Sequence, residues 1–505
     1  MMEWLVSLCF MAVYTLLVLG FVRLLSGHKD KPKKQMPPGP WTLPVIGNLH
    51  HLIRLLPHRA MHELSRRHGP LMLLKLGEVT TLVVSSAEVA EVVMKNHDLV
   101  FASRSSSVTL DIFGCGGKDI AFAPYGAHWR QMRKICVLKL LSSNQVNRME
   151  SIRAEELGSL LRHITTLAGA TINFSEKMTA LNNSIVSRAV FGGKFAKQGE
   201  YLCELDKAFK LVGGFCLVDL FPSSRLVRWL STGERNMKRS YGRMERIVAE
   251  AIEGRKATRA DIKEDEDLLG LLLRLQQEDS LEFPLTTETI GAVLFDMFSG
   301  ATETTGTVLA WAMSELIRSP ETMAKAQHEV REVLGENRDV IISCDLGELH
   351  YMRMVIKEVL RLHPPGPLIP RRAREDCKVM GYEISKDTNV CINLVAISQD
   401  PARWTNPDEF KPERFENNNL NYNGTYFDYI PFGAGRRQCP GIQFGSAVME
   451  MALTNFLYHF DWILPDGASL ASFDMSEKFG LTITRRYDLL LRAIPHQCFK
   501  AMPTN

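Results

Sequence analysis

Residues 431–441 read PFGAGRRQCPG, with one cysteine, Cys439, among three glycines, two prolines and two arginines. A cysteine binds metal as the thiolate, which nearby positive charge and backbone N–H groups stabilise. Gly433, Gly435 and Gly441 permit a tight turn whose amides can point at the sulfur. A lone thiolate in such a loop suits the proximal ligand of a haem. The alternative at this point is a buried structural cysteine.

The same loop carries a known signature. Phe432, Gly435, Arg437, Cys439 and Gly441 reproduce the pattern F-x-x-G-x-R-x-C-x-G, which resembles the cytochrome P-450 family of haem-thiolate monooxygenases. The resemblance implies heme b (iron protoporphyrin IX) as cofactor, with O2 as co-substrate. It implies that Cys439 is the metal ligand and that Phe432 and Arg437 help to bind the cofactor.

A second motif lies in KEVLRLHPP, where Glu358 and Arg361 are three residues apart on one helical face. The helix must end before Pro364. This is similar to the family's E-x-x-R motif, and the resemblance adds Arg414 of KPERF to a buried ion cluster near the cysteine loop. We expect the cluster to maintain architecture rather than to take part in chemistry.

A third motif, SGATETT, lies within an apolar stretch that predicts one long buried helix over residues 287–318. Gly300 and Ala301 are small enough for a flat ligand to approach, and Thr304 can bond its own backbone and open the helix locally. A Glu in an apolar helix is costly without a partner or a role. By resemblance, Glu303 and Thr304 are the catalytic acid and alcohol pair that supplies protons for O–O bond cleavage.

Haem propionates require cationic or hydrogen-bonding partners. HWRQMRK places Trp129 and Arg133 four residues apart, similar to the family's W-x-x-x-R pattern. The resemblance therefore implies four cofactor-binding residues in addition to the cysteine loop's Phe432: Trp129, Arg133, Arg371 and Arg437. Arg371 is followed by Arg372 where related plant sequences usually have Glu, so either arginine is a candidate.

The N-terminus contains a charge-free run of 19 residues, 4–22, with basic residues after it. This length spans a hydrocarbon core, and the flanks favour a single-pass anchor with the rest of the chain cytoplasmic. The alternative is a cleaved secretion signal. We expect a transmembrane anchor at 1–28, a basic and proline-rich hinge at 29–40, and one catalytic domain at 41–505. The expected location is the endoplasmic reticulum membrane.

The rest of the chain predicts a mainly α fold with small β-sheets in a single large domain, as in the P-450 fold. Strand-like segments lie at residues 71–86, 379–384 and 481–493. The net charge of +3 over 505 residues is small and forms no basic stripe, so we expect no nucleic-acid partner.

Taken together, the motifs resemble plant microsomal monooxygenases of specialised metabolism. The resemblance implies electrons from NADPH through a separate NADPH-cytochrome P-450 reductase, with cytochrome b5 as a second candidate donor and Arg436 and Lys134 as docking residues. Membrane lipid and an apolar small molecule, such as a terpenoid, are the other expected partners. The candidate substrate-facing residues are 107–117, 215–221, Val293, Phe298, 366–370 and 479–482.

Two other functions are compatible with part of this pattern. A haem protein that senses or carries a ligand would explain Cys439 but leave Glu303 and Thr304 without a role. An enzyme that rearranges hydroperoxides would need no reductase, but relatives of that type generally depart from the acid and threonine pattern. Dependence on NADPH and a reductase separates the monooxygenase from both.

Overall fold

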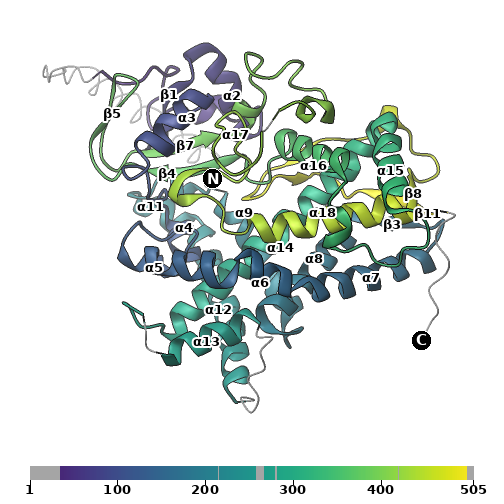
Figure 1. Ribbon diagram of the computed structural model, residues 1–505. Coiled ribbons are helices and arrows are strands. Elements are labelled where there is room, and N and C mark those ends of the chain that lie inside the picture. The colour runs from purple at the N-terminus through teal and green to yellow at the C-terminus, as the bar shows by residue number, and fades with distance from the viewer. Residues whose placement is uncertain (1–34, 214, 258–266, 279–280, 419, 497–505) are drawn as a thin grey trace, which may run out of the picture.

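The computed structural model describes residues 35–213, 215–257, 267–278, 281–418 and 420–496. Helices account for most of this chain, and short strands form small sheets (Figure 1), as the sequence predicts. The α-helices are α2 (Pro57–His68), α3 (Ala87–Glu91), α4 (Val108–Phe113), α5 (Ala127–Ile135), α6 (Ser143–Arg148), α7 (Glu150–Thr166), α8 (Phe174–Phe191), α9 (Gln198–Val212), α10 (Leu217–Leu220), α11 (Arg225–Leu230), α12 (Gly233–Ala257), α13 (Leu268–Glu278), α14 (Thr287–Arg318), α15 (Pro320–Leu334), α16 (His350–Leu362), α17 (Leu394–Ser398) and α18 (Ile442–His459).

The long helix α14 has the bounds that the apolar stretch predicts. Thr286 caps its N-terminus by accepting a hydrogen bond from Thr289 N, and the helix stops before Pro320. It is buried on nearly every side and packs against α8, α12 and α18. The helix is continuous through SGATETT, so the local opening expected at Thr304 is not observed.

The largest sheet has four strands in the order β1-β2-β7-β4. β1 and β2 are the two strands predicted within residues 71–86, and they pair antiparallel with Leu71 opposite Val84. The parallel pairing of β2 with β7 joins segments far apart in the chain. The strands are β1 (Leu71–Leu76), β2 (Val79–Val84), β3 (Thr171–Asn173), β4 (Leu368–Arg372), β5 (Cys377–Val379), β6 (Tyr382–Ile384), β7 (Asn389–Asn393), β8 (Phe460–Ile463), β9 (Glu477–Lys478), β10 (Thr484–Arg485) and β11 (Leu490–Pro495).

The segment predicted as a strand at 481–493 instead forms two strands in different sheets. β10 pairs with β9, whereas β11 lies between β3 and β8. The polar residues between β10 and β11 interrupt the alternation that a single strand needs. In the segment at 379–384, a tight turn at Met380 and Gly381, both with positive φ, makes a hairpin of β5 and β6.

The predicted anchor at residues 1–28 lies outside the described residues. Within the described ranges, no helix has both the length and the apolar character needed to cross a membrane. Residues 35–40, the described part of the predicted hinge, lie along β1, because Leu73 N donates to Pro38 O at 2.8 Å. A Cβ on Gly39 would lie 2.2 Å from Leu73 O, so only glycine permits this close approach. These residues are therefore attached to the catalytic domain rather than free.

Candidate active site

The cysteine loop lies before α18, and its shape depends on two glycines. Gly433 and Gly435 have φ of 69° and 68°, the left-handed region that glycine adopts without strain. A Cβ on Gly435 would lie 2.4 Å from Met94 O. Cys439 N donates to Phe432 O at 3.0 Å and closes the loop. The loop thus holds Cys439 at a fixed place at the N-terminal end of α18.

The Cys439 side chain faces a cavity and exposes its surface to it. Burial raises the pKa of the Cys439 thiol, whereas the Gly441 N–H, Arg133 and Arg104 act in the opposite direction. The expectation that a loop amide points at the sulfur is confirmed for Gly441. Positive charge and an N–H donor are the groups that stabilise a thiolate ligand.

The cavity of about 400 Å³ lies between the cysteine loop and α14. Its volume falls within the range of small-molecule sites, and its wall is mainly apolar. Residues of α4, α14, β4 and the segment between β9 and β10 also line it. The apolar side chains that line it include Phe113, Phe122, Phe209, Met297, Val308, Leu368, Ile369 and Leu481.

Four guanidinium groups gather at this cavity: Arg104, Arg133 and Arg437 line it and Arg371 lies beside them. Arg371 and Arg437 are buried, and Arg104 and Arg133 are partly buried. Burial, together with the neighbouring guanidinium groups, lowers the pKa of Arg104 to about 10 and that of Arg437 to about 9. The pKa of Arg371 is lowered for the same reasons. Clustered cations in a low dielectric are costly unless they meet negative charge.

Their hydrogen bonds to protein are mostly to neutral backbone carbonyls. Arg133 donates to Gln438 O, Arg371 to Pro370 O, and Arg437 to Ala102 O. These four cations fit the two carboxylates of a haem, and the cysteine sulfur faces the same cavity. The donor set fits a haem-thiolate site, in which the arginines would meet the propionates.

Trp129 makes two contacts beside the arginine cluster, one through its indole N–H and one through its ring with Arg437. Its indole nitrogen donates to Ile120 O at 2.9 Å, and the Arg437 guanidinium lies 4.2 Å from its ring centroid. Arg104 was not identified from the sequence. It stands in the serine-rich stretch 102–107, which has no motif or helical periodicity to single it out.

The choice between Arg371 and Arg372 follows from the alternation of β4. Arg371 is buried among the other arginines, whereas Arg372 points to the other face of the strand and pairs with Asp387 at 3.0 Å. The structure therefore favours Arg371 as the propionate partner.

Glu303 and Thr304 do not line the same cavity. Thr304 lines the cavity that Cys439 faces, and its hydroxyl donates to Gly300 O at 2.8 Å. Glu303 lines a second cavity of about 320 Å³ behind α14. Consecutive residues of a helix do not face each other, which explains the separation. Thr482 lines the first cavity and is hydrogen-bonded to the Glu303 carboxyl, so it connects the two.

The second cavity is polar. The Asn183 Oδ1, Thr302 Oγ1 and Glu303 Oε2 atoms are buried without a hydrogen-bond partner among the described residues. Buried polar atoms of this kind are normally satisfied by water. Burial raises the pKa of Glu303 to about 7, although the Thr482 hydroxyl acts to lower it. Glu303 is thus an acid that exchanges protons near neutral pH.

The candidate substrate-facing residues divide into two groups. Phe113, residues 366 and 368–370, and residues 481–482 line the cavity at Cys439. Val293 and Phe298 do not, and this prediction is wrong because both are buried in the core. Phe298 lies beside the cavity-facing position 297 and packs against aromatic rings of α8 and α9 instead. Residues 215–221 also lie outside the wall of this cavity.

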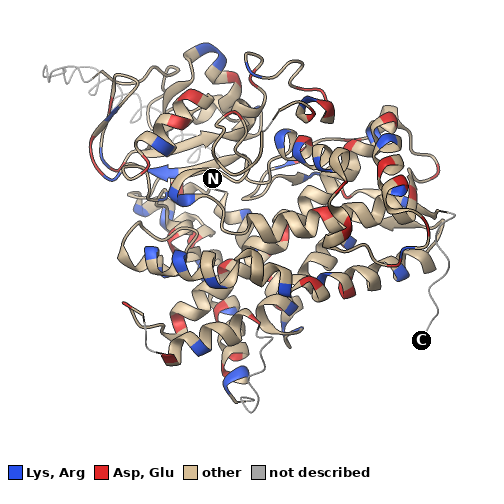
Figure 2. Cartoon of the chain, in the orientation of Figure 1, with Lys and Arg blue, Asp and Glu red and all other residues tan. Residues whose placement is uncertain are grey.

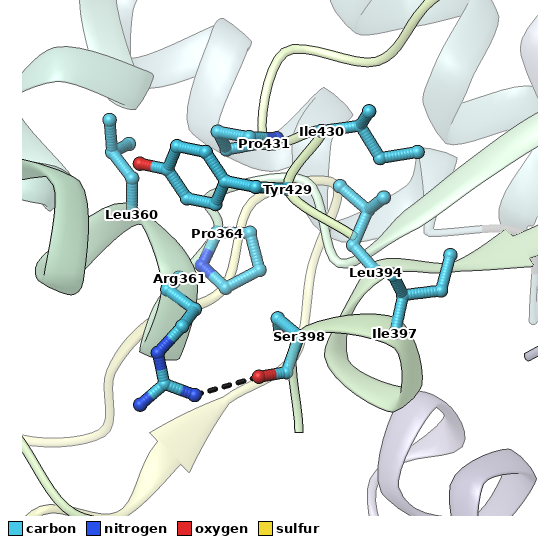
Figure 3. Close-up of a pocket in the computed structure, with 9 residues that line it drawn as sticks. All are labelled: Leu360, Arg361, Pro364, Leu394, Ile397, Ser398, Tyr429, Ile430 and Pro431. Carbon is cyan, nitrogen blue, oxygen red and sulfur yellow. Dashed lines mark hydrogen bonds between the residues drawn. The ribbon is translucent and has the colours of Figure 1, made fainter. Parts of the chain in front are cut away.

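The predicted ion cluster is present next to the cysteine loop. Arg361 donates twice to Glu358, at 2.7 and 2.9 Å, and Arg414 Nε donates to Glu358 Oε1 at 2.8 Å. The remaining Arg361 donors bind carbonyls, including Ser398 O at 2.7 Å (Figure 3). Tyr429, Ile430 and Pro431 of the chain entering the cysteine loop lie beside it, so the cluster supports the loop.

Comparison with known proteins identifies the family of the chain. The sequence profile of the cytochrome P-450 family matches residues 37–490. The chain is 45% identical over 483 residues to desmethyl-deoxy-podophyllotoxin synthase of Sinopodophyllum hexandrum, covering 94% of this chain and 95% of the relative. It is 41% identical over 496 residues to premnaspirodiene oxygenase of Hyoscyamus muticus, covering 97% and 99%.

Solved structures show the same fold. A zebra fish cytochrome P-450 determined with progesterone superimposes with a TM-score of 0.75 at 26% identity, covering 88% of this chain and all of that one. The chain belongs to the cytochrome P-450 family, whose members are haem-thiolate monooxygenases that use O2.

Proposed function

We propose that this protein is a membrane-anchored monooxygenase of the endoplasmic reticulum that inserts one atom of O2 into an apolar plant specialised metabolite, with a terpenoid as the leading class. Electrons come from NADPH through a separate NADPH-cytochrome P-450 reductase, with cytochrome b5 as a second donor. The observation that carries the proposal is Cys439 facing a mainly apolar cavity that Arg104, Arg133 and Arg437 also line, with Arg371 buried beside these arginines. When bound, haem supplies the oxygen activation that no side chain provides.

The cysteine loop and the arginine cluster would hold the cofactor from different sides. Cys439 would hold the iron, and Phe432 would close the cysteine loop. Arg133, Arg371 and Arg437, with Trp129 beside Arg437, would hold the propionates, joined by Arg104. This arrangement fixes the flat cofactor between the loop and α14, where the small residues Gly300 and Ala301 leave room.

Proton supply would depend on Glu303, Thr304 and Thr482. Glu303 takes protons from the polar second cavity, since its pKa of about 7 allows exchange at neutral pH. Thr482 and Thr304 present hydroxyl groups to the cavity at Cys439. The mainly apolar wall of that cavity excludes water around the substrate and favours terpenoid-like molecules.

An exposed apolar surface supports membrane contact by the catalytic domain as well as by the proposed anchor. In α11, Leu226, Trp229 and Leu230 are 64%, 75% and 63% exposed, and Ile53, before α2, is 79% exposed. Large exposed apolar side chains of this kind suit a lipid surface. Elsewhere the outer helices carry Lys and Arg interspersed with Asp and Glu (Figure 2).

Electron delivery would occur on the side of the cysteine loop. Arg436 is an exposed residue of the cysteine loop and pairs with Asp98 at 3.3 Å, and Lys134 is exposed on α5. Cations at these positions suit an acidic partner surface.

The first test is the difference spectrum of the dithionite-reduced full-length protein with and without carbon monoxide. We expect a strongly red-shifted Soret band that Cys439→Ala loses. A band typical of histidine-ligated haem would contradict the assignment of Cys439. Arg372→Ala is the matched control, because Arg372 faces away from the site and should leave the band unchanged.

The second test separates the candidate functions. Membranes that contain the protein and a reductase are incubated with NADPH and a panel of terpenoids and phenolics. Oxygenated product that requires both NADPH and the reductase supports the proposal. Turnover of a fatty-acid hydroperoxide without either would instead identify a rearranging enzyme, and ligand binding without any product would identify a carrier or sensor.

A further inference from the structure

The loop formed by Asp119, Ile120, Ala121, Phe122 and Ala123, here the 119–123 loop, lies between α14 and the arginine cluster. Its backbone groups are held from two sides. Carboxylates accept from its N–H groups, and arginine or tryptophan side chains donate to its carbonyl groups. Buried backbone groups need such partners, and few loops have them from side chains alone.

On the α14 side, the N–H groups meet Asp296. Its Oδ2 accepts from Ile120 N at 2.6 Å and from Ala121 N at 3.1 Å. Asp296 is buried and lies on the cavity side of α14, about two turns before Thr304. Within the loop, Asp119 Oδ2 accepts from Phe122 N at 2.8 Å.

On the cofactor side, the carbonyls meet the proposed propionate partners. Ile120 O accepts from Trp129 Nε1 at 2.9 Å and from Arg437 at 3.3 Å. Ala121 O accepts from Arg104 Nε at 2.9 Å, and Ala123 O accepts from Arg437. The peptide unit between Ile120 and Ala121 therefore binds Asp296 through its N–H and binds Trp129 and Arg437 through its carbonyl. The units on either side of it bind Asp296 through Ile120 N and Arg104 through Ala121 O.

We propose that Asp296 is a positioning residue for the cofactor: by fixing the N–H groups of residues 120 and 121, it orients the carbonyls that set the places of Trp129, Arg104 and Arg437. This inference rests on the proposed haem site. Asp296 itself meets none of the arginines in the described hydrogen bonds and acts through the loop. No sequence motif considered above includes Asp296 or Asp119.

The test measures the rate at which the haem-loaded protein transfers its haem to excess apomyoglobin. Asp296→Ala removes the acceptor of two backbone N–H groups, and we expect haem loss to be about tenfold faster. Both N–H groups bond a single oxygen, so the amide oxygen of Asp296→Asn can keep them, and this variant should stay within about threefold of wild type. The reduction potential of the haem should move in Asp296→Ala and return toward wild type in Asp296→Asn, since the arginines set the charge near the propionates.

Asp219→Ala is the matched control. Asp219 is also a buried carboxylate that accepts from a backbone N–H, that of Thr109 at 2.9 Å, but it joins α10 to α4 away from the arginines. We expect it to lower the free energy of unfolding while leaving haem loss within about twofold of wild type. Equal acceleration in Asp219→Ala and Asp296→Ala would overturn the proposal, as would haem loss at the wild-type rate in Asp296→Ala.

If Asp296→Ala does not accumulate as folded protein, Asp296→Ser provides the same comparison, because its shorter side chain cannot reach both N–H groups. Failure of the positioning role can also be distinguished from failure of the proposed function. A wild-type protein that binds no haem would contradict the haem site itself, whereas normal haem binding with unchanged Asp296 variants contradicts only the positioning role.

Discussion

Glu303 and Thr304 are adjacent in α14 but line two different cavities, and the Thr482 hydroxyl connects them. The Glu303 carboxyl is thus separated by α14 from the apolar cavity that Cys439 faces. This separation lets a carboxyl group stay in contact with water without bringing that water to the substrate.

The raised pKa of Glu303 predicts a specific dependence of stability on pH. Its folded-state pKa of about 7 exceeds the ordinary glutamate value of 4.5, so between these pH values the folded protein binds more protons than the unfolded chain. The contribution of Glu303 to the free energy of unfolding therefore falls as pH rises from about 4.5 to 7 and is constant outside that window.

Glu303→Gln should remove this dependence. Urea unfolding at pH 5, 6, 7 and 8 measures the free energy of unfolding of wild type and variant. The difference between these two free energies should change by up to about 1.4 kcal/mol per pH unit inside the window. The variant should also form product roughly 10- to 100-fold more slowly. A difference that is flat with pH would contradict the raised pKa.

Thr482→Val should raise the pKa of Glu303 further, because the hydroxyl that lowers it is lost. The upper limit of the pH window should then move above pH 7. It is measured by comparing, at each pH, the free energy of unfolding of Thr482→Val with that of the double variant Thr482→Val/Glu303→Gln. Thr484→Val is the control, since Thr484 lines the same second cavity. An unmoved limit in Thr482→Val would show that this hydroxyl does not interact with Glu303.

Glu358→Gln should destabilise the protein strongly. Both side chains of the Glu358 and Arg361 pair are fully buried, so the substitution leaves buried arginine charge without its counter-ion. We expect a loss of about 3–5 kcal/mol in the free energy of unfolding and a lower yield of haem-loaded protein. Asp387→Asn breaks the exposed pair with Arg372 and should cost less than about 1 kcal/mol. Similar effects of both substitutions would contradict the structural role of the cluster.

Gly435→Ala should disturb the cysteine loop. The φ of 68° is strained for alanine, and the added Cβ would meet Met94 O at 2.4 Å. We expect a loss of roughly 1–3 kcal/mol and a reduced ratio of haem to protein, measured by absorbance. Gly347→Ala should be nearly neutral, because φ is −51° and no heavy atom lies within 4 Å of the added Cβ.

The sequence predicts those parts of the molecule that depend on local pattern. A long apolar stretch was enough to bound α14, and a five-residue signature was enough to select Cys439. The ion cluster around Glu358 followed from motif resemblance and is present.

The parts that the sequence missed depend on contacts between distant segments. Arg104 and Asp296 have no local pattern, and their importance appears only where the 119–123 loop meets α14 and the cysteine loop. The burial of Val293 and Phe298 was missed because an all-round apolar helix does not show which face meets a cavity. The separation of Glu303 from Thr304 was available from helix geometry, since neighbouring residues point in different directions.

The position of β11 has a consequence for synthesis of the chain. This last strand pairs Leu490 with Asn173 of β3 and Ala493 with Trp462 of β8, and Leu491 is fully buried. The sheet cannot close until residues near the C-terminus have left the ribosome, so α7 and α8 must wait with part of their apolar surface uncovered. A chain truncated shortly before residue 490 would therefore lack the strand between β3 and β8, and its uncovered apolar surface would be exposed to chaperones and proteases.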